Sequence, residues 1–329
     1  MSLLDVRDLK TYFYIDNEVI PAVDGVNFNI NKGEIVALVG ESGSGKSVTS
    51  LSIMGLIKEP GKIVNGEIIF NKEDLLSKKE REMRRIRGKD IAMIYQDPMS
   101  SLNPYIRVGN QIAETLIIHK KISKADAKKE AIKMMELVGI PDADKRYKDY
   151  PSQFSGGMRQ RIMIAMAIAC EPKLLIADEP TTALDVTVQA EILDLLRRLM
   201  KDNGMSILLI THDLGVVAEI ADRVCIMYCG KIMEQSSKIS LFKNPLNPYT
   251  RGLIQCIPRT DDKAEVLYTI GGNVPYPTDF PKGCRFSTRC PDVMEKCKKE
   301  IPALADIGER HLVRCFLYEN SEVKKYDDN

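Results

Sequence analysis

The residues from Gly40 to Ser47 constrain the fold more than any other stretch, because they read Gly-Glu-Ser-Gly-Ser-Gly-Lys-Ser. An apolar run at 35–39 precedes them, and a helix is predicted from Lys46 to about Leu56. A strand, a glycine-rich turn and a helix in this order form a phosphate-binding loop, or P-loop. Glycine has no Cβ, so the backbone can curl and direct N–H groups at an anion, and the helix N-terminus adds its positive dipole. The sequence therefore predicts an α/β protein that binds a nucleotide, rather than a glycine-rich turn that binds nothing.

Two side chains of the P-loop have chemistry that suits a nucleotide. Lys46 would reach the outer phosphates, and the hydroxyl of Ser47 would hold Mg²⁺. The residues predicted to contact the nucleotide here are Ser42, Gly43, Ser44, Gly45, Lys46, Ser47 and Val48.

Length and charge narrow the class of protein. The 329 residues suffice for two domains, or for one large domain with an appendage. Lys and Arg number 47 against 46 Asp and Glu, which gives no electrostatic reason to expect nucleic acid as a partner. No apolar run approaches the ~20 residues that span a bilayer, and the N-terminus carries charge where a signal peptide needs an apolar core. A cytoplasmic chain is expected, and docking on a membrane partner stays open.

Three further apolar runs read as buried strands, and each ends in polar residues at the edge where α/β sheets place their chemistry. The residues at these strand ends are Gln96, Asp178 with Glu179, and His212. Asp178 could orient the water shell of Mg²⁺, and Glu179 could polarise an attacking water. The alternatives are that the two acids cap the next helix and that the lone histidine is structural.

Between these strands, residues 103–169 change to helical spacing, which predicts a helical insertion in the α/β domain. Near its end, Ser155 and two glycines open a long apolar helix, a second helix N-terminus suited to an anion. A plain helix cap explains Ser155, but it does not require Gly156 and Gly157 together with Gln160.

Shorter patterns complete the core. Residues 64–67 predict a turn that feeds a short strand at 68–70, and Gly230 centres a final hairpin. Among three consecutive aromatic residues, 12–14, one ring could stack on an adenine base, although strand packing explains such a run equally well.

The C-terminal part of the chain carries four cysteines after a Gly- and Pro-rich stretch, 271–282, which predicts a loop without regular structure. They are Cys284, Cys290, Cys297 and Cys315. The compartment disfavours disulfides. Zinc sites favour cysteines about two to four residues apart, a spacing absent here, whereas an iron–sulfur cluster tolerates wider gaps. Zinc and bare thiols remain alternatives to the cluster.

These motifs, taken together and in order, resemble the ATP-binding subunit of an ABC transporter. Phe154 to Gln160 is similar to the family signature LSGGQ, with Phe154 for Leu and Met158 for Gln. The other matches are Gln96 for the Q-loop, 174–179 for Walker B, 183–185 for the D-loop and His212 for the switch histidine. The resemblance singles out Phe13 as the adenine-stacking ring.

The resemblance implies a P-loop NTPase, with a RecA-like core, an antiparallel β part, an inserted helical subdomain and a Cys-rich tail. The boundaries are an ATPase domain at 1–242, its helical subdomain at about 103–169, and an extension at 243–329. Two such domains would pair head to tail around ATP, with Ser155, Gly157 and Gln160 acting in trans. Glu179, His212 and Gln96 would be catalytic, and Ser47, Gln96 and Asp178 would hold Mg²⁺.

Residues 96–104 and 244–253 narrow the resemblance to dipeptide, oligopeptide and nickel importers, and the second stretch reads as a linker and helix leaving the ATPase. Tails of this pattern resemble [4Fe–4S] binders. The implied partners are transmembrane permease subunits, a second ATPase subunit and, indirectly, an extracellular substrate-binding protein, at the cytoplasmic face of the membrane. The alternatives are a soluble ABC-type ATPase, a redox-responsive regulator that uses the cysteines, and an importer whose cargo is nickel or another small solute.

Overall fold

The computed structural model describes residues 1–97, 101–182, 184–257, 268–319 and 324–325. The chain divides into two compact units. The helical unit contains residue 1, residues 31–34 and residues 77–210. The P-loop unit contains residues 2–30, 35–76 and 211–329, so it gathers the P-loop and the cysteine-bearing extension.

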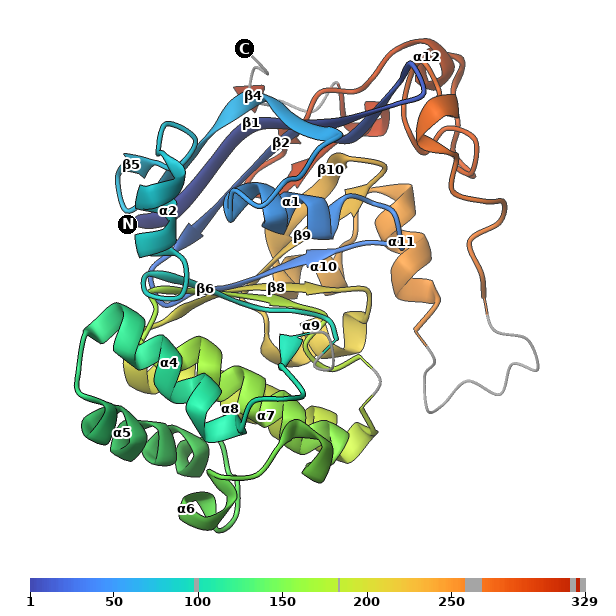
Figure 1. Ribbon diagram of the computed structural model, residues 1–329. Helices are drawn as coiled ribbons and strands as arrows, with labels where there is room; N and C mark the ends of the chain where they lie inside the picture. Colours follow the sequence, from blue (N-terminus) through green and yellow to red (C-terminus); the bar gives the residue numbers. More distant parts are fainter. Residues whose placement is uncertain (98–100, 183, 258–267, 320–323, 326–329) are drawn as a thin grey trace. The chain divides into compact units, whose positions relative to one another are not determined.

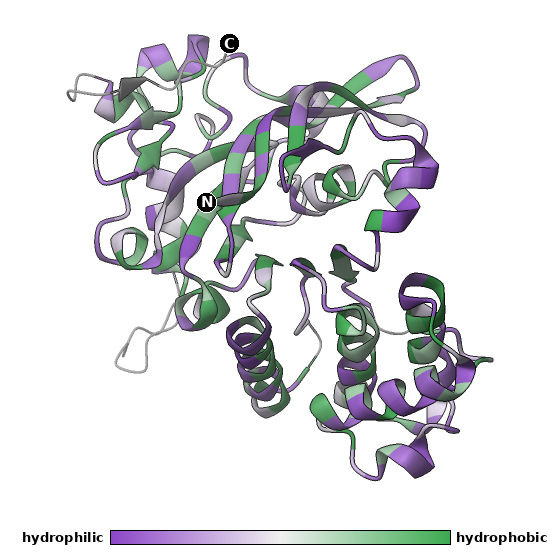
Figure 2. Ribbon diagram, turned by 90° about the vertical axis from the view of Figure 1, so that its left-hand side faces the viewer, coloured by the Kyte–Doolittle hydropathy of each residue, from purple (hydrophilic) through white to green (hydrophobic). Residues whose placement is uncertain are grey.

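A four-stranded antiparallel sheet belongs to the P-loop unit and has the order β2-β1-β4-β5. Hydrophilic and hydrophobic residues alternate along its long strands, as a sheet with one buried face requires (Figure 2). Its strands are β1 Ser2–Ile15, β2 Glu18–Asn31, β4 Gly61–Phe70 and β5 Glu73–Asp74.

The turn predicted at 64–67 is wrong, because β4 continues through these residues. Gly66 has a φ of 110°, and the pairing of β1 with β4 shifts register opposite it. A Cβ on Gly66 would lie 2.7 Å from the carbonyl oxygens of Arg7 and Asp8. A β-bulge therefore absorbs the Asn-Gly pair that the sequence pattern assigned to a turn.

A second set of strands in the P-loop unit continues from the strand before the P-loop. The five residues of β3, Ile35–Val39, are all buried, and β3 pairs in parallel with β9, Arg223–Tyr228. The predicted hairpin around Gly230 is confirmed, since β10, Lys231–Ser237, pairs antiparallel with β9. The extension adds further antiparallel strands, β12 Leu312–Val313, β11 Ala305–Asp306 and β13 Lys324–Lys325.

The helices of the P-loop unit are short. The stretch at 271–282 includes one 3-10 turn, Pro277–Asp279, where the prediction gave no regular element, because Pro277 presets φ for a first turn. The α-helices of the P-loop unit are α1 Lys46–Ile53, α9 Leu214–Ile220, α10 Lys238–Lys243, α11 Pro248–Gln255 and α12 Glu295–Lys299. A second 3-10 turn lies at Phe316–Tyr318.

The sequence led us to expect that a helix within 244–253 leaves the ATPase. Instead, α11 belongs to the P-loop unit. Tyr249 of α11 is fully buried, and its ring centroid lies 4.6 Å from that of Tyr228 and 5.2 Å from that of Phe286. Burying an aromatic ring of this size is strongly favourable, so α11 packs back into the P-loop unit.

The helical unit contains three parallel strands whose residues are almost all buried. Helices α4, α5 and α7 follow β6 in the chain, precede β7, and lie side by side (Figure 1). The strands are β6 Ile91–Ile94, β7 Leu174–Asp178 and β8 Ser206–Thr211. The helices are α2 Glu80–Ile86, α4 Val108–Lys120, α5 Lys124–Leu137, α6 Ala143–Arg146, α7 Gly156–Ile168 and α8 Val186–Asn203, with a 3-10 turn at Pro151–Gln153. Of the helices that the structure describes, none is both long and apolar enough to cross a membrane.

Candidate nucleotide-binding site

The P-loop curls between β3 and α1, and its glycines fit where no other residue would. Gly43 and Gly45 have φ values of 76° and 103°, which side chains with a Cβ rarely adopt. A Cβ on Gly40 would overlap the carbonyl of Met227, and one on Gly45 would overlap the carbonyl of Ala22. The tight curl therefore depends on both backbone freedom and the close approach of neighbouring main chain.

Lys46 lies inside this curl. Its Nζ donates to the carbonyl oxygens of Gly40 at 2.8 Å and Glu41 at 2.9 Å, and to Oγ of Ser44 at 3.3 Å. Gly45 is the N-cap of α1 and has no side chain, so no side-chain cap covers this helix N-terminus, whose dipole favours an anion. The ammonium group and the helix end thus bring positive charge to one small loop.

Other predicted residues of the P-loop unit differ in exposure. Ser42, Gly43 and Ser47 are exposed, and Val48 is half-buried. The ring of Phe13 lies against Gly61 of the neighbouring strand, since a Cβ there would be 2.6 Å from Cε1 of the ring. His212 follows β8 and is exposed.

The partners of Glu41, the second residue of the P-loop, were missed by sequence reasoning. Both carboxylate oxygens accept hydrogen bonds from Arg289 of the extension, and the Glu41 N–H donates to the hydroxyl of Tyr249. The separation between Glu41 and these residues exceeds 200 positions. No local pattern in the sequence can reveal such a contact.

In the helical unit, the end of β7 brings together two of the predicted catalytic residues. Asp178 is buried, and Glu179 follows it with a φ of 47°. Oε2 of Glu179 accepts from Nε2 of Gln96 at 2.9 Å and from Oγ1 of Thr182 at 2.9 Å. A left-handed glutamate is costly unless its surroundings hold it, and such conformations cluster at functional sites.

The N-terminus of α7 is also in the helical unit. Oγ of Ser155 accepts from the N–H of Met158 at 3.3 Å, so Ser155 is the N-cap. A Cβ on Gly157 would lie 2.6 Å from Cγ1 of Val188, whereas a Cβ on Gly156 would meet no atom within 4 Å. Gly157 is thus explained by packing inside the chain, and Gly156 is not.

Gln160 has a role inside this chain that the resemblance did not predict. Its side chain is 2% exposed, and its Nε2 donates to the carbonyl of Pro180 at 2.6 Å. It therefore fixes α7 to the loop that follows β7. Ala183 of the predicted D-loop lies outside the described residues, as do residues 98–100 of the segment used to narrow the family.

The four cysteines of the extension line one pocket with Phe286 and Met233. Burial raises the pKa of Cys290 to about 11 and that of Cys315 to about 12, and it also raises the pKa of Cys284. Within the described part of the chain, no group of three or more His, Cys, Asp or Glu side chains is arranged to hold a metal ion. The pocket therefore gathers four cysteine side chains, without the close ligand geometry of an ion site.

Comparison with known proteins decides the family. The ABC transporter family matches residues 23–182, and the family described as the C-terminal region of oligopeptide/dipeptide transporters matches residues 233–297. The oligopeptide transport ATP-binding protein AppD of Bacillus subtilis is 54% identical over 325 residues, which are 98% of this chain and 99% of AppD. The chain belongs to the ABC transporter ATP-binding proteins of the oligopeptide/dipeptide type. The resemblance predicted from the motifs is thus confirmed.

Other members of the family are similar over nearly their whole length. The dipeptide transport ATP-binding protein DppD of Bacillus subtilis is 50% identical, covering 97% of this chain and 95% of DppD. The oligopeptide transport ATP-binding protein OppD of Escherichia coli is 49% identical, covering 96% of this chain and 93% of OppD.

Solved ABC cassettes share the fold. A dimeric post-hydrolysis structure of the cassette MJ0796 bound to ADP and Pi has a TM-score of 0.65 and 27% identity, covering 71% of this chain and 98% of MJ0796. This ABC-family chain has the P-loop NTPase fold of an ATPase cassette, built from mixed α/β sheets, and binds ATP.

Proposed function

We propose that this ATPase drives uptake of dipeptides or oligopeptides through a membrane permease. The observation that carries the proposal is the glycine curl around Lys46, which concentrates main-chain N–H groups and one ammonium group where a triphosphate would bind. The transport class is supported by the match of residues 233–297 and by the names of AppD, DppD and OppD.

Each predicted residue of the nucleotide site receives a role in this proposal. Lys46 binds the outer phosphates, Phe13 stacks on adenine, and residues 42–48 surround the phosphates. Glu179 polarises the attacking water, while Gln96 and His212 sense the γ-phosphate. The left-handed backbone of Glu179 and its hydrogen bond from Gln96 support a carboxylate held ready for this step.

Three oxygen-bearing side chains would hold Mg²⁺, namely Ser47, Gln96 and Asp178. A hydroxyl, an amide and a carboxylate are the hard oxygen ligands that this ion prefers, so the donor set fits. When bound, Mg²⁺ supplies positive charge that neutralises the phosphates of ATP.

A second cassette, identical or homologous, completes the site in this proposal. Ser155, Gly157 and Gln160 would act in trans on the nucleotide of the partner, Gln160 by holding α7 through Pro180. Support comes from the open space beside Gly156 and from the dimeric structure of MJ0796 with bound ADP and Pi. Closure around ATP and reopening after hydrolysis would then move the permease.

The proposed organisation is an ATPase domain at 1–242 with a helical subdomain at about 103–169, and a Cys-rich extension at 243–329. Helices α4 to α7, which lie between β6 and β7, support the helical subdomain. The proposed partners are permease subunits, a second ATPase subunit and, through the permease, an extracellular substrate-binding protein. We place the protein on the cytoplasmic face of the membrane, because it would dock on a permease from the side where ATP is present.

A [4Fe–4S] cluster held by Cys284, Cys290, Cys297 and Cys315 is the second part of the proposal. Its support is the donor set, since four thiols line one pocket. The described side chains as arranged do not form an ion site, so loading would bring the thiolates closer. Anaerobic purification with iron, sulfide and zinc analysis tests it: four iron and four sulfide per chain support the cluster, and zinc or neither metal contradicts it.

Lys46→Ala is the direct test of the nucleotide site. We expect ATP affinity to fall at least about 100-fold, because a buried charge-assisted contact to the phosphates is lost. Lys298→Ala removes an exposed lysine paired with Glu295 and serves as the matched control. Titration with a fluorescent ATP analogue measures affinity, and uptake of a labelled dipeptide in cells that also contain the permease measures transport. Unchanged affinity in Lys46→Ala contradicts the site, and uptake of nickel instead of peptide contradicts the cargo.

A further inference from the structure

Glu41 presents an electrostatic problem inside the P-loop. A loop that binds a triphosphate gains nothing from a carboxylate of its own, since like charges at short range repel. In this chain Arg289 binds that carboxylate with both arms of its guanidinium, Nη1 to Oε2 at 2.7 Å and Nη2 to Oε1 at 3.1 Å. Such paired hydrogen bonds fix direction as well as charge. The Glu41 side chain is 27% exposed, so the pair is only partly screened by water.

Arg289 is itself held in place from several sides. Its side chain is 5% exposed, its Nε donates to the carbonyl of Gly271 at 3.1 Å, and its Nη2 donates to the carbonyl of Ile270 at 3.3 Å. Nη1 also donates to the hydroxyl of Tyr228 at 3.3 Å. A guanidinium with this many partners has little freedom left to lose when it binds a carboxylate.

A second contact reaches the main chain of the P-loop. The hydroxyl of Tyr249 accepts a hydrogen bond from the N–H of Glu41 at 3.0 Å. The ring of Tyr249 is buried against Tyr228 and Phe286, and Phe286 also lines the cysteine pocket. The loop is thus contacted through its backbone by α11 and through its side chain by Arg289.

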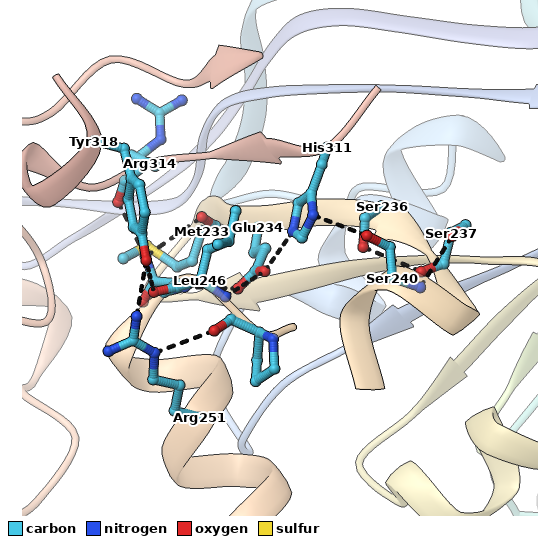
Figure 3. Close-up of polar contacts among 12 residues, drawn as sticks. Met233, Glu234, Ser236, Ser237, Ser240, Leu246, Arg251, His311, Arg314 and Tyr318 are labelled. Atoms are coloured by element: carbon cyan, nitrogen blue, oxygen red, sulfur yellow. Dashed lines mark hydrogen bonds and ion pairs between the residues drawn. The ribbon is translucent and has the colours of Figure 1, made fainter. Parts of the chain in front are cut away.

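The extension that supplies these two residues is firmly attached to β10 (Figure 3). The carboxylate of Glu234 is fully buried, accepts from the N–H groups of Leu246 and Asn247 at 2.9 Å each, and lies 2.7 Å from Nε2 of His311. Arg314 adds a backbone hydrogen bond to the carbonyl of Met233 at 2.8 Å. Because a buried carboxylate without partners is costly, these contacts hold the extension in one position.

We propose that Arg289 and Tyr249 of the C-terminal extension are positioning residues of the ATP site, which turn Glu41 away from the phosphates and hold the P-loop open for them. The inference rests on the proposed binding of ATP by the P-loop. It assigns the extension a part in nucleotide binding, separate from any group that the four cysteines hold.

A double-mutant cycle distinguishes this role from plain structural support. In Arg289→Gln the carboxylate of Glu41 loses its counter-charge, and we expect the Kd for ATP to rise about tenfold. In Glu41→Gln there is no charge to neutralise, so the Kd is unchanged or lower. In the double variant the effect of Arg289→Gln should shrink to less than about twofold, because residues that act through one another are not additive.

Two further variants keep the test decisive. Tyr249→Phe keeps the buried ring and removes only the acceptor, and we expect a rise in Kd of about threefold from a lost hydrogen bond. Asp292→Asn changes a carboxylate on the same extension whose contact with Arg251 is long, 3.7 Å, and exposed, and it should leave the Kd unchanged. Thermal unfolding of every variant, with the full-length chain, shows whether it is folded.

The outcomes separate the inference from the proposed function. If Lys46→Ala abolishes binding but Arg289→Gln binds ATP normally, the P-loop assignment stands and the inference is overturned. The inference is also overturned if Arg289→Gln raises the Kd for ATP equally in the chain with Glu41 and in the chain with Glu41→Gln, since that result indicates general destabilisation. If Arg289→Gln does not fold, Glu41→Gln and Tyr249→Phe decide: a rise in Kd for Tyr249→Phe without one for Glu41→Gln supports the inference, and any other pattern overturns it.

Discussion

The chain has two helix N-termini that suit an anion, and they are built differently. At α1, Gly45 provides no cap, Lys46 lies inside the curl, and main chain of the same unit approaches the glycines closely. At α7, the hydroxyl of Ser155 already caps the helix, and a Cβ added to Gly156 would meet no atom of the described chain within 4 Å.

This difference indicates separate roles for the two helix N-termini in binding ATP. The α1 end has its cation and a helix N-terminus without a side-chain cap within one chain, so we propose that it binds a phosphate by itself. The α7 end satisfies part of its own first turn through Ser155, and it opens on two glycines rather than on a lysine. These features fit a surface that becomes useful only when a second molecule brings the ligand. Predictions that affect one end and spare the other test this contrast.

The largest effect is expected from Glu179→Gln. The amide cannot accept the proton of the attacking water, so turnover should fall about 10²- to 10³-fold while ATP affinity persists. ATP would then stay bound at the α1 end, and cassettes paired through α7 should accumulate. Phosphate release measures turnover, and size-exclusion chromatography with ATP and Mg²⁺ measures pairing. Normal turnover in this variant would falsify the role of Glu179.

A matched pair of glycine variants should separate the two faces of α7. Gly156→Val adds a side chain to open space, so Tm and ATP affinity of the single chain should be unchanged, while ATP-dependent pairing weakens about tenfold. Gly157→Val would collide with Val188, and Tm should fall by several degrees because overpacking strains the core.

Differential scanning fluorimetry and analytical ultracentrifugation measure these two properties. If Gly156→Val pairs as well as the unchanged chain, the open space beside Gly156 does not bind the nucleotide of a second chain. The α7 end would then lose the role that distinguishes it from the α1 end.

The smallest effect is expected from Ser155→Ala. Loss of the cap on α7 should cost about 1 kcal/mol of folding stability, a value typical for N-cap serine. If the hydroxyl also contacts the nucleotide of a second chain, ATP-dependent pairing falls as well, whereas a cap alone lowers stability and leaves pairing intact. Urea unfolding gives the first quantity and ultracentrifugation the second. Ser42→Ala, at an exposed position of the P-loop, provides the comparison at the α1 end.

Local chemistry made much of the site predictable. The P-loop, the polar ends of β6, β7 and β8, and the cap of α7 all depend on a few neighbouring residues and on the period of the apolar pattern. The prediction failed at 64–67, where an Asn-Gly pair imitates a turn but lies in a bulge of β4. It also failed for α11, because packing against residues far along the chain decides where an amphipathic helix lies.

The sequence by itself determined that a nucleotide loop, two acids after a buried strand and a glycine-rich helix start occur in one chain, since each follows from residues next to one another. Only the tertiary structure decided that Arg289 pairs with Glu41 and that Gln160 donates to Pro180. The physical reason is that the two hydrogen-bonded contacts join residues 248 and 20 positions apart. Their formation depends on how the strands and helices pack, and the free energy of that packing is spread over the whole core.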